Sequence, residues 1–269
     1  MSTNAAAPPS NHLSLRGVDF AYSQSGAGPL VLNAHGLTSS RAHNAKAGFA
    51  DFSTVAEAGY RVVSYDARGH GASTGTPVPE TYSWNALAED FLALADHFST
   101  TTPVTAIGAS MGTGTVLHAA TQQPDRFDRL VLTAPPTAWE TRAGQSGMYR
   151  MMADTVESSD PAILQAMMSR APVPAIFEGV EGYPPPPDVA HEVLPAVFRG
   201  AALSDLPPID AIAALRHPTL IIAWAGDPGH PVSTAEKLAE AMPNATLHVS
   251  NSFSDVQRWG ELARGFLAR

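Results

Sequence analysis

The sequence predicts an α/β fold built on a mostly parallel, twisted sheet with helices on both faces. Two continuous apolar runs, residues 29–34 (PLVLNA) and 218–223 (PTLIIA), are typical of strands covered on both faces. Such runs alternate with longer stretches of helical periodicity, which favours parallel strands joined by crossover helices. One segment, residues 135–215, breaks this alternation with many prolines and no strong strand, so we expect a helical insertion there.

The individual elements follow from the same patterns, with glycine and proline marking many of their ends. The helix expected up to residue 58 is closed by Gly59 as a C-cap, and residues 82–99 carry an amphipathic stripe. In chain order we expect one or two weak strands within 13–22, strand 29–34, helix 45–58, strand 60–65, a glycine-rich loop 66–73, helix 82–99, strand 103–107, helix 112–123, strand 129–133, strand 218–223, helix 233–242, strand 245–249 and helix 255–267.

Composition excludes several classes of function. The 269 residues carry a net charge of −9 and offer no basic patch for phosphates, so we expect no nucleic-acid partner. The chain has no cysteine for a disulfide or thiolate site, and no His-Glu-x-x-His spacing that suggests a metal. The first ten residues lack the features of a secretory signal, and no apolar run is long enough for a membrane span. We therefore expect a cytoplasmic protein that acts on a small molecule without a cofactor; its oligomeric state stays open.

The motif with the most chemical content is Gly108-Ala109-Ser110-Met111-Gly112, which lies between a predicted strand and a predicted helix. A Gly-x-Ser-x-Gly in this context is typical of a nucleophile elbow, a tight turn that lifts the serine hydroxyl clear of the sheet. Glycine is needed on both sides of the serine because a side chain there would collide with the neighbouring strand or helix. The motif therefore predicts Ser110 as a nucleophile.

Four motifs, in this order and spacing, resemble the α/β-hydrolase superfamily. They are the step 35–37 (HGL), the loop 68–73 (RGHGAS), the turn 108–112 (GASMG) and the loop 226–231 (GDPGHP). The resemblance covers nearly the whole chain outside the insertion and implies the α/β-hydrolase fold, with residues 1–134 and 216–269 as its core. It also implies that residues 135–215 form a cap, or lid, that lies over the active site and sets substrate choice.

The resemblance assigns roles to the matching positions. Ser110 is the expected nucleophile, and the backbone N–H groups of Leu37 and Met111 are the expected oxyanion hole, where fixed donors stabilise the charge that develops in the reaction. Gly36 lets the main chain approach the substrate. Asp227, after the penultimate strand, matches the acid that orients a histidine base.

The sequence leaves open which residue acts as the general base for Ser110. In the family it normally follows the last strand, but the loop 250–255 (SNSFSD) has no histidine and carries Phe253 near the expected position. Ser110 needs a base, because a serine hydroxyl is a weak nucleophile at its own pKa. Three interpretations stay open: His230 serves from the Asp227 loop, a histidine near Phe253 has been removed by engineering or evolution, or the domain is no longer an enzyme.

Three other side chains near these motifs receive secondary interpretations. The family resemblance makes His35 a structural residue of the oxyanion turn, and His70, in a tight loop, is expected to bond to the backbone. Glu140 follows the strand at 129–133, after which some members of this fold place their acid, so it is a spare candidate for that role.

A cap must present an apolar face to the ligand crevice, and methionine adapts to varied ligands. The candidate lining residues are Trp139, Met148, Met152, Met168, Phe177 and Phe198. The arginines of the insertion form no cluster, which favours a neutral or weakly polar acyl substrate.

Taken with the family resemblance, these residues predict a serine hydrolase that cleaves carboxylic esters or lactones of small to medium apolar acyl groups through an acyl-enzyme. Two alternatives remain. The chain could be a catalytically impaired or non-catalytic small-molecule binder on the same fold, or the same residues could serve a C–C bond hydrolase or perhydrolase.

Overall fold

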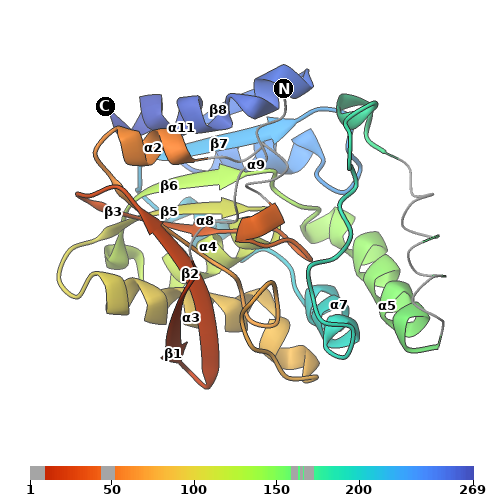
Figure 1. Cartoon of the computed structure of the whole chain (residues 1–269). Helices are drawn as coiled ribbons and strands as arrows, with labels where there is room; N and C mark the ends of the chain where they lie inside the picture. The colour runs from red at the N-terminus through yellow and green to blue at the C-terminus, as the bar shows by residue number, and fades with distance from the viewer. Residues whose placement is uncertain (1–9, 44–51, 159–162, 164–165, 167–172) are drawn as a thin grey trace.

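The structure is a computed structural model that describes residues 10–43, 52–158, 163, 166 and 173–269. Within these residues one eight-stranded sheet runs in the order β1-β2-β4-β3-β5-β6-β7-β8 (Figure 1). The β1–β2 and β2–β4 pairs are antiparallel and all later pairs are parallel, so the predicted mostly parallel sheet is confirmed. The strands are β1 (Asn11–Leu15), β2 (Val18–Ser25), β3 (Leu30–Ala34), β4 (Arg61–Tyr65), β5 (Val104–Ala109), β6 (Phe127–Thr133), β7 (Thr219–Trp224) and β8 (Ala245–Ser250).

Helices cover both faces of this sheet, as predicted (Figure 1). One face carries α3, α4, α8 and α9, and the opposite face carries α2, α10 and α11. Their bounds are α2 (Ser53–Glu57), α3 (Trp84–Phe98), α4 (Met111–Gln122), α8 (Ile209–Ala213), α9 (Val232–Ala241), α10 (Phe253–Gln257) and α11 (Trp259–Leu267). Short 3-10 turns lie at η1 (Pro79–Tyr82), η2 (Pro124–Arg126), η3 (Trp139–Thr141) and η4 (Ala175–Phe177).

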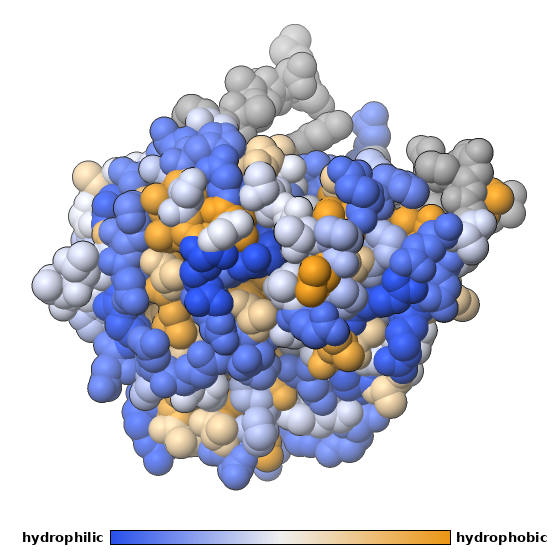
Figure 2. All heavy atoms as spheres, turned by 90° about the horizontal axis from the view of Figure 1, so that it is seen from below, coloured by the Kyte–Doolittle hydropathy of each residue, from blue (hydrophilic) through white to orange (hydrophobic). Residues whose placement is uncertain are grey.

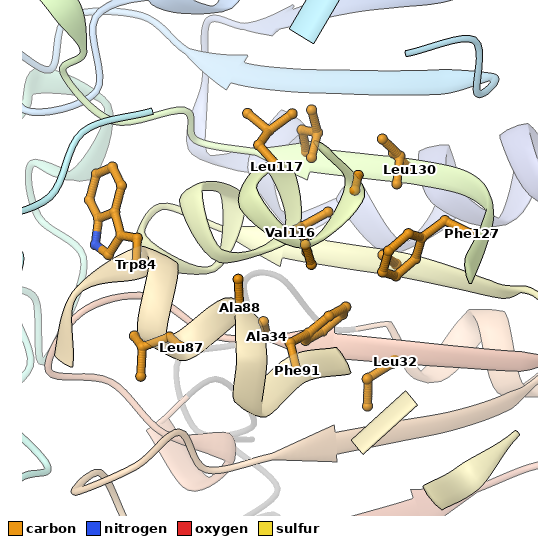
Figure 3. Packing of buried hydrophobic residues seen from close by; sticks show 14 of the residues in the cluster. Leu32, Ala34, Trp84, Leu87, Ala88, Phe91, Val116, Leu117, Phe127 and Leu130 are labelled. Atoms are coloured by element: carbon orange, nitrogen blue, oxygen red, sulfur yellow. The ribbon is translucent and has the colours of Figure 1, made fainter. Parts of the chain in front are cut away.

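The larger core lies between the sheet and the α3–α4 pair (Figure 3). Phe91 of α3, Leu117 of α4, Leu32 of β3 and Leu130 of β6 are all completely buried there. Each such side chain contributes about 1.5–3 kcal/mol on burial. This packing fixes the central strands, and it therefore gives the loops at their carboxyl ends a rigid base.

Two predicted helices differ from the observed ones. Residues 45–51 of the helix expected at 45–58 lie outside the described residues, and α2 begins at Ser53. The helix expected at 255–267 is two helices, because the backbone at Arg258 leaves helical geometry between α10 and α11. The first of them begins early, at Phe253, because Ser252 and Asp255 form a reciprocal capping box there.

The segment predicted as a cap leaves the sheet after β6 and returns at β7. Its helices α5 (Arg142–Ser158) and α7 (Leu194–Ala202) pack together at one end of the molecule (Figure 1). Between these two helices in the chain, Val189 forms an isolated bridge with His70, which joins the segment to the glycine-rich loop. The last part of the segment packs against the sheet core and not with α5 and α7, because α8 contacts α4 and α9. The division into a core and a cap at 135–215 stays a prediction.

The surface seen from below, on the side of α3 and α7, is mainly hydrophilic, and its apolar residues gather in several separate areas (Figure 2). In the described part of the chain, no helix has both the length and the apolar character to cross a membrane.

Candidate active site

Ser110 stands on a strained turn between β5 and α4. Its φ of 53° and ψ of −110° lie in a region that residues with a side chain rarely adopt. Two neighbours brace the turn: the Ser110 N–H donates to the Thr133 carbonyl, and the Thr113 hydroxyl donates to the Gly108 carbonyl. The side chain of Ser110 is half-buried, so the turn presents the hydroxyl at the surface of the site.

The glycines on either side of Ser110 are required by close backbone contacts. A Cβ on Gly108 would overlap the backbone of Gly112, and a Cβ on Gly112 would overlap the Ala34 carbonyl of β3. These contacts join the elbow turn to its own helix and to the adjacent strand. The glycine pattern therefore has the steric origin that the sequence predicts.

Replacing Gly112 with alanine should consequently destabilise the fold by about 1–3 kcal/mol or more, because the new methyl group meets backbone that cannot move aside. Gly147 in α5 is a matched control, since a Cβ there meets nothing within 4 Å. Its replacement with alanine should stabilise the protein by about 0.5–1 kcal/mol. Urea denaturation measures both, and equal effects of the two substitutions would contradict the steric argument.

The structure brings three predicted site residues together as one hydrogen-bonded series, which we call the triad. Ser110 Oγ lies 2.8 Å from His230 Nε2, and His230 Nδ1 lies 2.7 Å from Asp227 Oδ2. An ionised carboxylate only accepts hydrogen bonds, so His230 donates from Nδ1 and its Nε2 accepts from the Ser110 hydroxyl. The side chains of His230 and Asp227 are 24% and 10% exposed, so the series remains open to solvent at the imidazole.

Asp227 and His230 belong to one short loop that follows β7. The His230 N–H donates to the Asp227 carbonyl at 3.2 Å, which closes the turn, and Gly226 supplies a positive φ of 81° just before it. Thr137 donates its N–H to the Gly229 carbonyl, which ties the loop to the segment after β6. Because β6 alone separates β5 from β7, the loop lies within side-chain reach of Ser110.

The Asp227 carboxylate accepts three hydrogen bonds. Besides His230, the Trp224 indole donates to Oδ2 at 3.0 Å and the Gly229 N–H donates to Oδ1 at 2.8 Å. Burial alone would raise the pKa of Asp227, but the hydrogen bonds and the nearby imidazole outweigh it and lower the pKa to about 2. The carboxylate is therefore ionised at neutral pH and can stabilise a protonated His230.

Phe253 occupies the region where the family's usual base would be expected. It begins α10, and its ring packs edge-on against Phe177 with centroids 6.0 Å apart. The site nevertheless contains an imidazole at hydrogen-bond distance from Ser110. This distance favours His230 among the three interpretations, and its role as the base stays a prediction.

The step after β3 lies beside Ser110, since a Cβ on Gly36 would be only 3.5 Å from the Ser110 Cβ. His35 Nδ1 lies 2.7 Å from the Gly36 carbonyl, which also accepts from Ser39 N–H, while His35 Nε2 accepts from Ala67 N–H at 2.8 Å. In a trans peptide the C=O and the following N–H point in opposite directions. Holding the Gly36 carbonyl thus fixes the direction of the next N–H, that of Leu37.

The buried histidines next to this step have structural contacts. His70 Nδ1 donates to the Arg68 carbonyl, as predicted for a backbone-bonded loop residue. Burial lowers the pKa of His35, and burial together with the charge of His35 lowers that of His70 to about 3. Both side chains are therefore neutral at physiological pH. The expected oxyanion-hole role of the N–H groups of Leu37 and Met111 stays a prediction.

The predicted lining residues of the 135–215 segment fall in different places. Met152 is half-buried and packs with Phe198 in a small apolar cluster that also touches the side chain of Leu37. Phe177 lies instead against Trp224 on the opposite face of the sheet. Met148 is 41% exposed, and Met168 lies outside the described residues, so their roles stay predictions.

Two further residues singled out in the sequence contact Lys237 of α9. The Trp139 indole donates to the Pro207 carbonyl, and its ring lies under the Lys237 ammonium at 4.8 Å, packed against the core; its lining role stays a prediction. Glu140 forms an ion pair with the same Lys237 at 3.0 Å. Because Asp227 holds the histidine, the spare role for Glu140 is wrong.

Sequence reasoning missed Trp224, which contacts two members of the triad. It donates to Asp227, and its ring meets the His230 ring edge to face with centroids 5.2 Å apart. The available signal was its position, three residues before Asp227 at the end of a buried strand.

Comparisons with known proteins agree with the fold. A model of the alpha/beta hydrolase fold family matches residues 29–257. A curated relative, 3-oxoadipate enol-lactonase 2 of Acinetobacter baylyi, is 28% identical over 200 residues, covering 71% of this chain and 70% of its own.

Two solved structures resemble the fold along almost its whole length. A hydrolase from Pseudomonas aeruginosa is 24% identical with a TM-score of 0.71, covering 98% of this chain and 100% of that one. An alpha/beta hydrolase enzyme from a Medee basin deep-sea metagenome library is 16% identical with a TM-score of 0.79, covering 96% and 98%. Together with the family match, the fold and the strand–turn–helix around Ser110 lead to one conclusion: this chain belongs to the alpha/beta hydrolase fold family.

Proposed function

We propose that the protein is a serine hydrolase that cleaves carboxylic esters or lactones of small to medium apolar acyl groups. The observation that carries the proposal is the continuous hydrogen-bonded series from Ser110 Oγ through His230 to the Asp227 carboxylate. A nucleophile, a base within hydrogen-bond reach and a group that orients the base are the features that acyl transfer needs.

In the proposed reaction the Ser110 oxygen attacks the substrate carbonyl carbon while its proton moves to His230 Nε2. Asp227 stabilises the imidazolium that forms. The N–H groups of Leu37 and Met111 would receive the negative charge on the former carbonyl oxygen, each typically contributing about 3 kcal/mol to the lowering of the barrier. The imidazolium then protonates the leaving alkoxide, and a water activated by the same imidazole releases the acyl group from Ser110.

The character of the expected acyl pocket supports an apolar substrate. Leu37 and Met152 both pack against the buried cluster that contains Phe198, which places an apolar cluster next to the turn beside Ser110. Two arginines of the 135–215 segment are engaged: Arg142 is buried and donates to the carbonyls of Ser204 and Ala201, and Arg199 pairs with Asp154 and Glu157. The inclusion of lactones is supported by a curated relative that is named as an enol-lactonase.

A fluorophosphonate probe tests this proposal, because it reacts with an activated serine and with little else. We expect one stoichiometric adduct on Ser110 in the folded wild type, detected by peptide mass spectrometry, and none in Ser110→Ala. A panel of p-nitrophenyl esters of increasing chain length and of simple lactones then reports the substrate class.

Two results would speak against it. Failure of the folded wild type to form the adduct would remove the serine mechanism. Saturable binding of an apolar ester without release of product would favour the small-molecule binder on the same fold.

A further inference from the structure

Trp224 is the one side chain among the described contacts that touches both the acid and the base of the proposed mechanism. Its indole N–H donates to Asp227 Oδ2, the same oxygen that accepts the proton of His230 Nδ1. The Gly229 N–H donates to the other oxygen. Because both carboxylate oxygens have a donor besides His230, the carboxylate plane cannot rotate without breaking a hydrogen bond.

The ring of Trp224 also limits the orientation of His230. The two rings meet at 69°, with centroids 5.2 Å apart, an edge-to-face arrangement that aromatic pairs prefer. Rotation of the imidazole away from Ser110 would lose this contact together with the bond to Asp227. One side chain therefore restrains both the acceptor of the histidine proton and the plane of the histidine.

Trp224 is itself firmly held. It is 7% exposed, its ring stacks on Trp259 with centroids 5.2 Å apart and an interplanar angle of 15°, and Phe177 packs edge-on at 5.0 Å. Two neighbouring rings thus restrain Trp224, which can transmit this rigidity to the loop that follows it.

We propose that Trp224 is a positioning residue that holds Asp227 and His230 in the geometry needed to deprotonate Ser110. The proposal rests on the serine-hydrolase function proposed above. Its chemical consequence is specific: the indole competes with His230 for Asp227 Oδ2, so removing it leaves a more basic oxygen, which stabilises the protonated imidazole.

The test is Trp224→Phe, which keeps an aromatic ring and removes the N–H, with Trp259→Phe as the matched control. Both tryptophans are buried in the same cluster, but the Trp259 indole bonds to Ser250 and not to the triad. We expect Trp224→Phe to lower kcat by roughly ten- to a hundredfold, the cost typical of a misplaced reacting group. The acid limb of its kcat/KM profile should also move to higher pH, while Trp259→Phe should match the wild type in both measurements.

Other titratable groups near Asp227 should not produce this acid limb. Burial raises the pKa of Tyr149 on α5, and burial with the nearby Asp227 charge raises that of Tyr183 to about 12. Both phenols are neutral over the range in which an imidazole titrates.

A measurement on the unaltered protein keeps the inference falsifiable if Trp224→Phe does not fold. In proton NMR of the wild type, the Trp224 indole N–H should shift with the same apparent pKa as His230, and the Trp259 indole should not. An indole N–H of Trp224 that ignores the titration of His230, or a folded Trp224→Phe whose kcat and acid limb match those of Trp259→Phe, would overturn the inference. Failure of Ser110 labelling in the wild type would instead reject the proposed function, so the two failures are distinguishable.

Discussion

Replacing His230 with alanine is expected to lower kcat/KM for ester hydrolysis by roughly 10⁴- to 10⁶-fold, the loss typical when a base acts as a unit with its serine. Nε2 is the acceptor 2.8 Å from the Ser110 hydroxyl, and alanine leaves that proton without an acceptor. Steady-state rates with a p-nitrophenyl ester measure the loss, and the rate of fluorophosphonate labelling should fall with it.

His248 provides the matched histidine control. It lies within β8, paired with Ile222 of β7, and its replacement with alanine should leave turnover near the wild-type value. Wild-type turnover in His230→Ala would remove His230 as the base.

The same ester assay, applied to the variant Phe253→His, separates the competing interpretations of the missing histidine. If a lost histidine near Phe253 were the cause of an impaired site, Phe253→His would raise activity greatly. We expect no gain, because His230 already bonds to Ser110 and because Phe253 packs against Phe177. A large gain would instead favour the lost-base interpretation.

The second large effect is expected for Asp227→Asn, which should reduce kcat by about 10⁴-fold. The amide can turn its NH₂ group toward His230, and the imidazole would then present the wrong tautomer to Ser110. Glu140→Gln makes the same chemical change at the spare acid position, where the carboxylate pairs with Lys237, and should leave kcat unchanged. Equal activity of Asp227→Asn and the wild type would contradict the assigned role of the acid.

Stability should respond to pH through the same residue. The folded pKa of Asp227, about 2, lies below its ordinary value of 3.8, so its ionised form contributes stability that is fully present above the ordinary value and lost as the pH falls toward 2. The difference in free energy of unfolding between the wild type and Asp227→Asn should therefore shrink over that range in urea titrations.

Much of the sheet could be predicted because strands buried on both faces need apolar residues at nearly every position. β3 and β7 are buried along their whole length, and both were visible as continuous runs. The boundary near Arg258 could not be predicted from periodicity, since the apolar pattern continues through the break between α10 and α11. There the backbone conformation of one residue decides the structure.

The candidate site also contains residues that local sequence patterns predict and residues whose contacts depend on distant parts of the chain. Ser110 and Asp227 could be proposed because the elbow and the strand-end loop are local patterns with a steric or positional signature. His230 was one of three interpretations, because the direction of an imidazole depends on how β6 separates the two loops. The contacts of Trp139 could not be predicted, because Pro207 and Lys237 are distant from it in the sequence.

The four residues Asp-Pro-Gly-His at 227–230 place the proposed acid and the proposed base in one turn. Because Asp227 and His230 lie in the same turn, that turn sets their relative geometry, and no second loop has to meet the first. Under the proposed mechanism the chain beyond Ser250 supplies no base, and residues such as Val256 and Trp259 pack in the core. A search for relatives with this arrangement should look for Asp-x-x-His after the strand two places from the serine strand, since a search for a histidine after the final strand would pass over them.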